Sequence, residues 1–205
     1  MSDFNSLTAS ELGDKIGQGE IDTVELTEYF LSQIELSPIG KKIYSTVTSQ
    51  LALEQAKESK RRADLGCRFS SLDGVPISWK DLFDIKGYPC EAGSELLAGR
   101  LASKNSKVYK FAEAHGLICL GKTHMSELAF SGLGLNPVRE TPPCVNYPES
   151  VPGGSSSGAA TSVSFGLAAA GIGSDTGGSV RIPAAWNDLV GFKTTAGKLS
   201  LDGVV

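Results

Sequence analysis

The apolar residues in the first third of the chain recur at a helical spacing. Leu26, Phe30 and Ile34 are four residues apart, which places them on one stripe of a helix, while the polar residues between them fall outside that stripe. The pattern therefore predicts an amphipathic helix that starts near Asp22 or Thr23.

Two more helices and a strand flank this segment. Thr8 and Glu11 match a capping box, in which each side chain hydrogen-bonds to the backbone of the other residue, and they predict the start of a short helix. Residues 43–48 show the β-branched alternation that is typical of a strand. Ser49 then predicts the N-cap of a third helix that runs to about Leu65.

The middle of the chain predicts two short strands with a helix between them. Residues 75–79 form an apolar run after an Asp-Gly turn, and this strand delivers Lys80 at its end. Asn105 or Ser106 is expected to cap the helix. The second apolar run, residues 117–120, predicts a buried strand. The apolar positions of the helix are Val108, Phe111 and Ala112.

The last third predicts an irregular segment followed by regular structure. Residues 137–154 are rich in proline, asparagine and glycine, which favour turns over helices and strands. A helix is expected over 159–166, and a small apolar run follows at 167–172. Because helices and strands alternate along the chain, we expect an α/β fold with a mixed, largely parallel β-sheet covered by helices.

Composition narrows the class of protein. The chain has 205 residues, of which 40% are hydrophobic and 20% charged, and these values are ordinary for a globular domain. A net charge of −4 and the lack of a dense basic run argue against direct binding of nucleic acid or of an anionic membrane. No signal peptide or membrane span is recognised, so a cytoplasmic location is expected.

The cysteines predict neither disulfides nor a metal site. The four cysteines have no CxxC spacing, and Cys119 lies within an apolar run, where a buried free thiol is common. We therefore expect structural thiols, with no metal and no cofactor.

One segment matches a phosphate-binding motif by its letters alone. Residues 116–123 fit the pattern GxxxxGK[ST], which in nucleotide-binding proteins follows a strand and precedes a helix. Here a predicted helix precedes the segment, and its four middle residues are strand-like. The favoured interpretation is a helix end followed by a core strand and a turn, with nucleotide binding as the alternative.

A glycine-rich and serine-rich stretch provides the strongest chemical signal. Residues 173–183 form a loop whose free N–H groups can hold an anion beside a serine hydroxyl. A second motif, Gly-x-Ser-x-Gly, is centred on Ser156, but its usual partners are an acid and a histidine later in the chain. His115 and His124 both precede the serines, so the hydrolase order of that triad is impossible here.

Lysine is the next candidate for the base, because burial disfavours its charged form. Lys80 follows an apolar strand, where a side chain can point into a cleft. The alternative is a surface ion pair between Lys80 and either Asp81 or Asp84, and the local sequence leaves both interpretations open.

Four ordered motifs resemble those of the amidase signature family. They are residues 74–81, 121–129, 152–158 and 173–185. The resemblance covers residues 65–205 and adds a helical lead-in, residues 1–64, to one amidase domain. It implies the amidase signature fold, incomplete at the C-terminal side, and hydrolysis of the C–N bond of a small carboxamide through an acyl-enzyme.

The resemblance also implies roles for individual residues. Ser179 matches the nucleophile, Ser155 the bridging serine that follows a cis peptide bond, and Lys80 the base. The oxyanion hole would comprise the backbone N–H groups of Thr176, Gly177, Gly178 and Ser179.

Further positions have a supporting role or border the substrate. An Asp175–Arg181 ion pair would brace the loop, and Ser156 would either join the catalytic hydrogen bonds or cap the following helix. A stretch after the predicted strand at 117–120 matches the border of the acyl pocket, with ordinary packing as the alternative. It comprises Met125, Ser126, Leu128, Ala129, Phe130 and Ser131.

Two other functions stay open. The chain could be the amidase component of a tRNA-dependent glutamine amidotransferase, or an inactive fragment whose role is association. Relatives in the family extend well beyond this length, so we expect exposed strand edges and apolar faces that a second copy or a partner chain covers.

Overall fold

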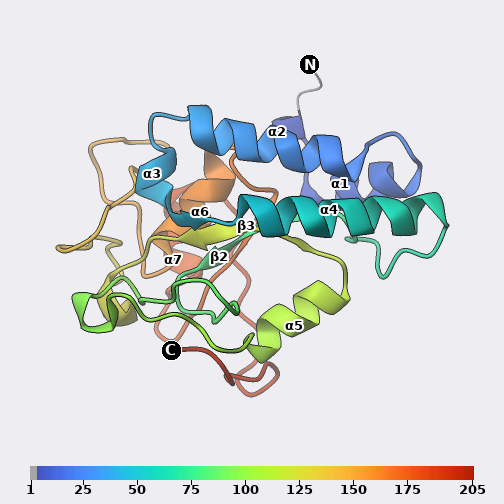
Figure 1. Cartoon of the computed structure of the whole chain (residues 1–205). Helices are drawn as coiled ribbons and strands as arrows, with labels where there is room; N and C mark the ends of the chain where they lie inside the picture. Colours follow the sequence, from blue (N-terminus) through green and yellow to red (C-terminus); the bar gives the residue numbers. More distant parts are fainter. Residues whose placement is uncertain (1–3) are drawn as a thin grey trace.

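The computed structural model describes residues 4–205 and contains one mixed sheet (Figure 1). Its strands are β1 (Tyr44–Val47), β2 (Pro76–Lys80), β3 (Ile118–Thr123) and β4 (Ala170–Ile172). They lie in the order β1-β3-β2-β4, with β2 parallel to both β3 and β4 and with β1 antiparallel to β3. The prediction of a mixed, largely parallel α/β sheet is confirmed.

Helices pack around this sheet, and α2 and α4 lie side by side along it (Figure 1). The α-helices are α1 (Ala9–Gly17), α2 (Thr23–Leu36), α3 (Gly40–Ile43), α4 (Ser49–Asp64), α5 (Lys107–Ala114), α6 (Ser157–Ser164) and α7 (Arg181–Trp186). Short 3-10 turns occupy Phe4–Ser6, Glu95–Leu97 and Glu127–Ala129. Among the described residues, no helix has the length and apolar character needed to cross a membrane.

The helix starts follow the capping signals in two cases and differ in a third. Thr8 and Glu11 form both hydrogen bonds of the capping box, and Asp22 accepts from the first backbone N–H groups of α2. The expected cap at Ser49 is wrong, because Thr48 occupies the cap position. Its hydroxyl donates instead to the Cys119 carbonyl at 2.8 Å, which ties the start of α4 to β3.

Helix α5 turns a different face inward than its apolar residues suggest. Tyr109 and Ala112 are buried, whereas Phe111 is 62% exposed and stacks on His115. Residues three apart share a helix face, and Tyr109 contacts Trp79 in the central strand with ring centroids 5.2 Å apart. The aromatic contact in the core therefore selects the buried face. Helices α3 and α7 have no counterpart among the predicted elements, and residues 192–199 contain no strand.

Strand β2 is the buried centre of the fold, and its two faces meet different elements. Ser78 lies 2.7 Å from Ser162 of α6, hydroxyl to hydroxyl. Trp79 points to the other face, where it packs edge-on against Phe83. Because neighbouring residues in a strand point to opposite faces, Lys80 shares the α6 side with Ser78.

The segment that matches the phosphate-binding pattern is a core strand. Gly116 follows α5, and residues 118–123 form β3, which is wholly buried. Lys122 donates to the Asp81 carboxylate at 2.8 Å and to the Pro89 carbonyl at 3.1 Å, and its side chain is inaccessible to solvent. The interpretation as a helix end and core strand is confirmed, although the strand continues where a turn was expected.

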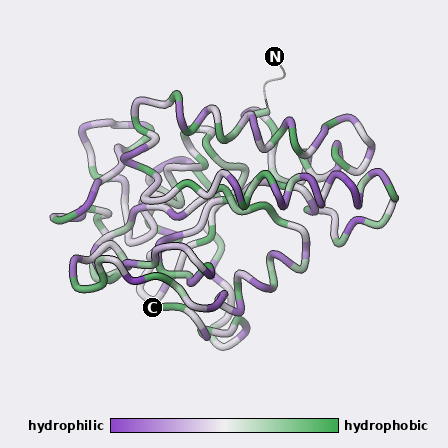
Figure 2. The backbone as a smooth tube through the Cα atoms, viewed as in Figure 1, coloured by the Kyte–Doolittle hydropathy of each residue, from purple (hydrophilic) through white to green (hydrophobic). Residues whose placement is uncertain are grey.

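The cysteines and the hydropathy pattern also agree with the sequence. All four cysteines are free, and Cys90, Cys119 and Cys144 are buried. The helix α4 is largely hydrophilic and lies along the outside of the molecule (Figure 2). Its buried contacts come from Ala52 and Ala56, which pack against Ile118 of β3.

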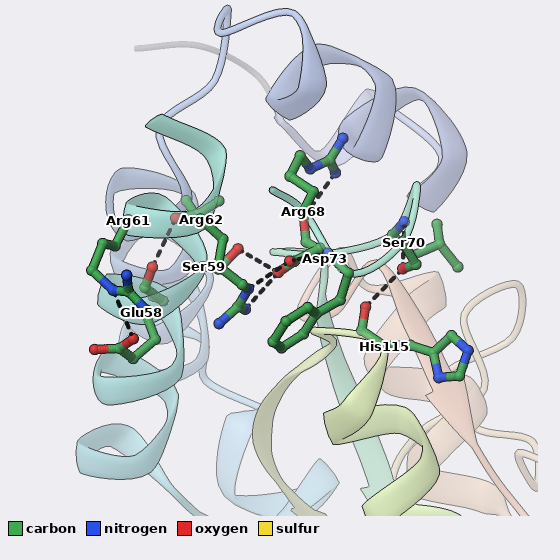
Figure 3. A network of polar contacts seen from close by, with 12 residues as sticks. Glu58, Ser59, Arg61, Arg62, Arg68, Ser70, Asp73 and His115 are labelled. Carbon is green, nitrogen blue, oxygen red and sulfur yellow. Dashed lines mark hydrogen bonds and ion pairs between the residues drawn. The ribbon is translucent and has the colours of Figure 1, made fainter. Parts of the chain in front are cut away.

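A buried carboxylate anchors the turn that leads into β2 (Figure 3). Asp73 accepts two hydrogen bonds from the Arg62 guanidinium, both at 2.7 Å, and one from the Ser59 hydroxyl at 2.7 Å. The backbone N–H of Phe69 is a fourth donor, at 2.8 Å. Burial alone would raise the pKa of Asp73, but these donors, with Arg62 first, lower it below 3.8. The network thus joins α4 to the start of the central strand.

We predict that Asp73→Asn lowers the free energy of unfolding by about 3 kcal/mol, because it leaves the Arg62 guanidinium without its buried partner. Because the folded carboxyl has a lowered pKa, its stabilisation is present above pH 3.8 and disappears as the pH falls further. Urea unfolding of both proteins at several pH values measures this difference.

The matched control is Glu58→Gln, which removes an exposed ion pair with Arg61 on the same helix. Such pairs contribute little, so the unfolding midpoint should barely move. Equal effects of the two substitutions would contradict an anchoring role for Asp73.

Candidate active site

The candidate catalytic residues gather where the parallel strands end. Lys80 is the last residue of β2 and is paired with Thr123, the last residue of β3. Trp79, one residue earlier, is paired with Ile172 at the end of β4. Parallel strands place their carboxyl ends at one edge, where ligand sites of α/β sheets commonly form. The loops after β3 and β4 therefore start beside Lys80.

Lys80 is completely buried and faces two serine hydroxyls. Its Nζ donates to Ser155 Oγ at 2.6 Å and to Ser174 Oγ at 2.8 Å. The alternative of a surface ion pair with Asp81 or Asp84 is wrong. Asp81 pairs with Lys122 and Asp84 with Arg100 instead.

Burial lowers the pKa of Lys80 from 10.5 to about 7, although the Asp175 carboxylate acts in the opposite direction. An ammonium group loses its hydration in the interior, so the neutral amine is favoured. A lysine that titrates near neutrality can accept a proton from a hydroxyl.

Ser155 is held by a backbone clasp between two loops. The Gly154–Ser155 peptide bond is cis. The N–H groups of Gly153 and Gly154 donate to the carbonyls of Leu133 and Gly132, and Ser126 N–H donates to the Ser155 carbonyl. A Cβ atom at Gly154 would lie 2.6 Å from the Gly134 nitrogen, so this approach requires glycine.

Ser156 bonds with the loop after β4 and does not cap a helix. It occupies the N-cap position of α6, but its side chain makes no capping hydrogen bond. Its hydroxyl accepts from Ser174 N–H at 3.3 Å and donates to the Ser174 carbonyl at 3.2 Å. A Cβ atom at Gly173 would come within 2.5 Å of Ser156 Oγ, so the loop can only lie this close with glycine there.

Ser174 is the site residue that the sequence analysis missed. It supplies the second hydroxyl at Lys80 Nζ, and Ser156 fixes its backbone. The available signal was its position two residues after Ile172, because a strand parallel to β2 ends at the same edge as Lys80.

Ser179 lies at the start of α7 and is half-buried. Its carbonyl accepts from Ser156 N–H at 3.1 Å, while its hydroxyl has no hydrogen-bond partner within residues 4–205. The free hydroxyl is available to a substrate or to Ser155.

Asp175 organises the turn that carries Ser179. Its carboxylate accepts from the N–H groups of Gly178 and Val180 and from both the backbone and the guanidinium of Arg181. The Arg181 guanidinium, more than any other group, lowers the pKa of Asp175, with the backbone donors adding to it. The expected Asp175–Arg181 ion pair is present at 2.9 Å.

The N–H groups of the loop differ in their availability. Gly178 N–H donates to Asp175 Oδ1 at 2.8 Å. Across the described chain, the N–H groups of Thr176, Gly177 and Ser179 have no partner. Three of the four expected donors are therefore free to bind an anion.

The expected border of the acyl pocket follows β3 closely. Met125 and Ser126 are buried, and the Ser126 hydroxyl donates to the Ser131 carbonyl at 3.0 Å. Leu128 and Ala129 adopt positive φ angles of 48° and 62°, and Phe130 is 92% exposed. Asn136, which sequence reasoning did not single out, holds the start of this segment by donating to the Met125 carbonyl at 2.8 Å.

Neither histidine takes part in this arrangement. Burial lowers the pKa of His124, and His115 lies at the end of α5 with its ring 2.8 Å from the Phe111 carbonyl. Within the described part of the chain, neither imidazole hydrogen-bonds to a serine hydroxyl.

Comparison with known proteins gives a consistent result. A family model described as Amidase matches residues 25–205. A glutamyl-tRNA(Gln) amidotransferase subunit of Acinetobacter baylyi is 36% identical over 213 residues, which are all of this chain and 42% of that protein. The same subunit of Anaeromyxobacter dehalogenans is 40% identical over 197 residues, covering 95% of this chain and 40% of that protein.

Solved structures agree in fold. Peptide amidase from Stenotrophomonas maltophilia superimposes with a TM-score of 0.91 at 29% identity, over 98% of this chain and 43% of that one. A fatty acid amide hydrolase gives a TM-score of 0.86 at 27% identity, over 98% and 36% respectively. The chain thus spans about two fifths of the length of the curated relatives it matches.

The buried lysine predicts a distinctive dependence of stability on pH. Unfolded lysine stays protonated up to pH 10.5, whereas folded Lys80 is neutral above about pH 7. Wild-type stability should therefore rise relative to Lys80→Met by about 1.4 kcal/mol per pH unit between those values. Chemical unfolding of both proteins at intervals across this range measures the slope, and a constant difference would contradict a neutral Lys80.

Proposed function

This chain belongs to the amidase signature family, and from that membership we propose that it carries the catalytic centre of an enzyme that hydrolyses carboxamide C–N bonds. One observation carries the proposal. A buried lysine with its pKa near 7 donates to the hydroxyl of Ser155, beside a loop that presents Ser179. The substrate class is a small-molecule amide.

The proposed reaction uses two serines and one base. Neutral Lys80 accepts the Ser155 proton while Ser155 accepts the Ser179 proton, so that Ser179 Oγ attacks the amide carbonyl. The same relay then returns a proton to the departing nitrogen, and the C–N bond breaks to leave an acyl-enzyme. Water, activated along the same path, releases the acid. Support comes from the 2.6 Å contact of Lys80 with Ser155 and from the unpaired Ser179 hydroxyl.

The proposed oxyanion hole consists of free backbone N–H groups. Thr176, Gly177 and Ser179 supply them, and each such donor is typically worth about 3 kcal/mol to a transition state. Gly178 N–H is engaged by Asp175, so we assign it to shaping the turn. Ser174 is proposed to hold the Lys80 amine in line with Ser155.

A second candidate function is the amidase component of a tRNA-dependent amidotransferase. Two relatives at 36% and 40% identity are named as subunits of such an enzyme, which is the observation in its favour. In this case the site would release ammonia from glutamine for use by a partner protein.

Either function is proposed to need polypeptide over an exposed apolar face. Val190 is 98% exposed and Phe192 79% exposed, and Trp186 is partly exposed nearby in sequence. Large exposed apolar groups in proximity mark interaction surfaces. A second copy or a partner chain is the occupant that the sequence leads us to expect.

Labelling with a fluorophosphonate tests the nucleophile. We expect mass spectrometry to find the adduct on Ser179, and we expect Ser179→Ala to abolish it. Lys80→Ala should slow labelling by about 10²-fold or more, because the serine then lacks its base.

Ser164→Ala is the matched control, since Ser164 lies at the end of α6 and its hydroxyl contacts only the Thr161 carbonyl. Its labelling should equal that of the wild type. An adduct that persists in Ser179→Ala would contradict the assignment of the nucleophile.

Ammonia release separates the two candidate functions. A self-contained amidase should release ammonia from a peptide C-terminal amide in a Ser179-dependent manner without any added chain. An amidotransferase component should instead release it from L-glutamine, and only in the presence of a co-purified partner. Ser179-independent release from both substrates would contradict both functions.

A further inference from the structure

We infer that Arg181 is a positioning residue that offsets the charge of Asp175 and thereby sets the pH at which Lys80 becomes neutral. The catalytic meaning of this inference rests on the proposed function. The electrostatic effect itself can be measured without any substrate.

The geometry concentrates negative charge close to the base. Asp175 directly follows Ser174, whose hydroxyl accepts from Lys80 Nζ at 2.8 Å. The Asp175 side chain is only 2% exposed, so water screens its charge poorly. A buried carboxylate this near would favour the lysine ammonium over the amine.

Arg181 is the cation that opposes this effect. Its Nε and Nη2 atoms each lie 2.9 Å from an Asp175 oxygen, in the paired geometry that guanidinium and carboxylate groups favour. The remaining donors to Asp175 are backbone N–H groups, which carry no net charge. Loss of Arg181 would therefore leave a net negative charge in the loop.

The other charged groups packed around Lys80 are already compensated. Asp81 pairs with Lys122 of β3, and Asp84 pairs with Arg100. His124, also after β3, has a pKa lowered by burial. Of all these groups, Asp175 is the one whose charge raises the pKa of Lys80. The Asp175–Arg181 pair is thus the adjustable element of the electrostatic surroundings.

Bracing of the loop, the role expected from sequence, is a different effect. A brace that fails would displace the free N–H groups and lower activity at every pH. An offset that fails would move the titration of Lys80 to higher pH. The two effects are separable because only the second changes a protonation equilibrium.

The test is NMR titration of the full chain labelled with ¹³C at lysine Cε, with the Lys80 signal assigned by its loss in Lys80→Met. In Arg181→Gln we expect the Lys80 midpoint to rise by about 0.5–1 pH unit. Arg181→Lys keeps the positive charge and should return the midpoint toward that of the wild type, even though it lacks the paired geometry.

A double-mutant cycle gives the inference its strictest form. Asp175→Asn should lower the Lys80 midpoint, and Arg181→Gln added to Asp175→Asn should no longer produce the full upward shift. If Arg181→Gln fails to fold, Asp175→Asn alone still decides. An unchanged Lys80 midpoint in Asp175→Asn, or in a folded Arg181→Gln, would overturn the inference.

This experiment is independent of the proposed function. Failure of fluorophosphonate labelling would remove the nucleophile assignment while leaving the titration shifts intact. Normal labelling with an unmoved Lys80 midpoint would remove only the role of Arg181.

Discussion

The burial of one lysine without a carboxylate partner is the constraint on which the site depends. Lys80 ends the central strand, has no exposed surface, and contacts two hydroxyls instead of an acid. Burial of an ammonium group is unfavourable, so the structure favours the amine at neutral pH. A carboxylate in contact with Lys80 would reverse that preference and remove the base.

The surrounding ion pairs can be understood from this requirement. Asp81 follows Lys80 directly, yet strand geometry turns it to the opposite face, where Lys122 binds it. Asp175 follows Ser174 and is bound by Arg181 and by backbone donors. Each acid near the base is therefore engaged elsewhere. The same contacts fix the loops, so electrostatics and loop geometry are maintained by one set of interactions.

Local signals in the sequence predicted most of the elements but not how they pack. The stripe at Leu26 and Phe30 and the capping box at Thr8 gave correct helices, because both depend on neighbours within one turn. The inner face of α5 was wrong at Phe111, because contact between Tyr109 and Trp79 decides it. Helix α7 was missed, since its six residues follow a glycine-rich loop and carry no clear periodic pattern.

For the site, the sequence by itself determined which groups are available. It identified the serine loop, the lack of a histidine in the usual order, and Lys80 at the end of an apolar strand. Only the tertiary structure decided that Lys80 is buried against Ser155 and Ser174, that Ser156 binds the loop after β4, and that Gly178 N–H is occupied. The physical reason is separation along the chain: Lys80 and Ser174 meet because β2 and β4 are parallel and end at one edge. No local pattern in the sequence encodes that pairing.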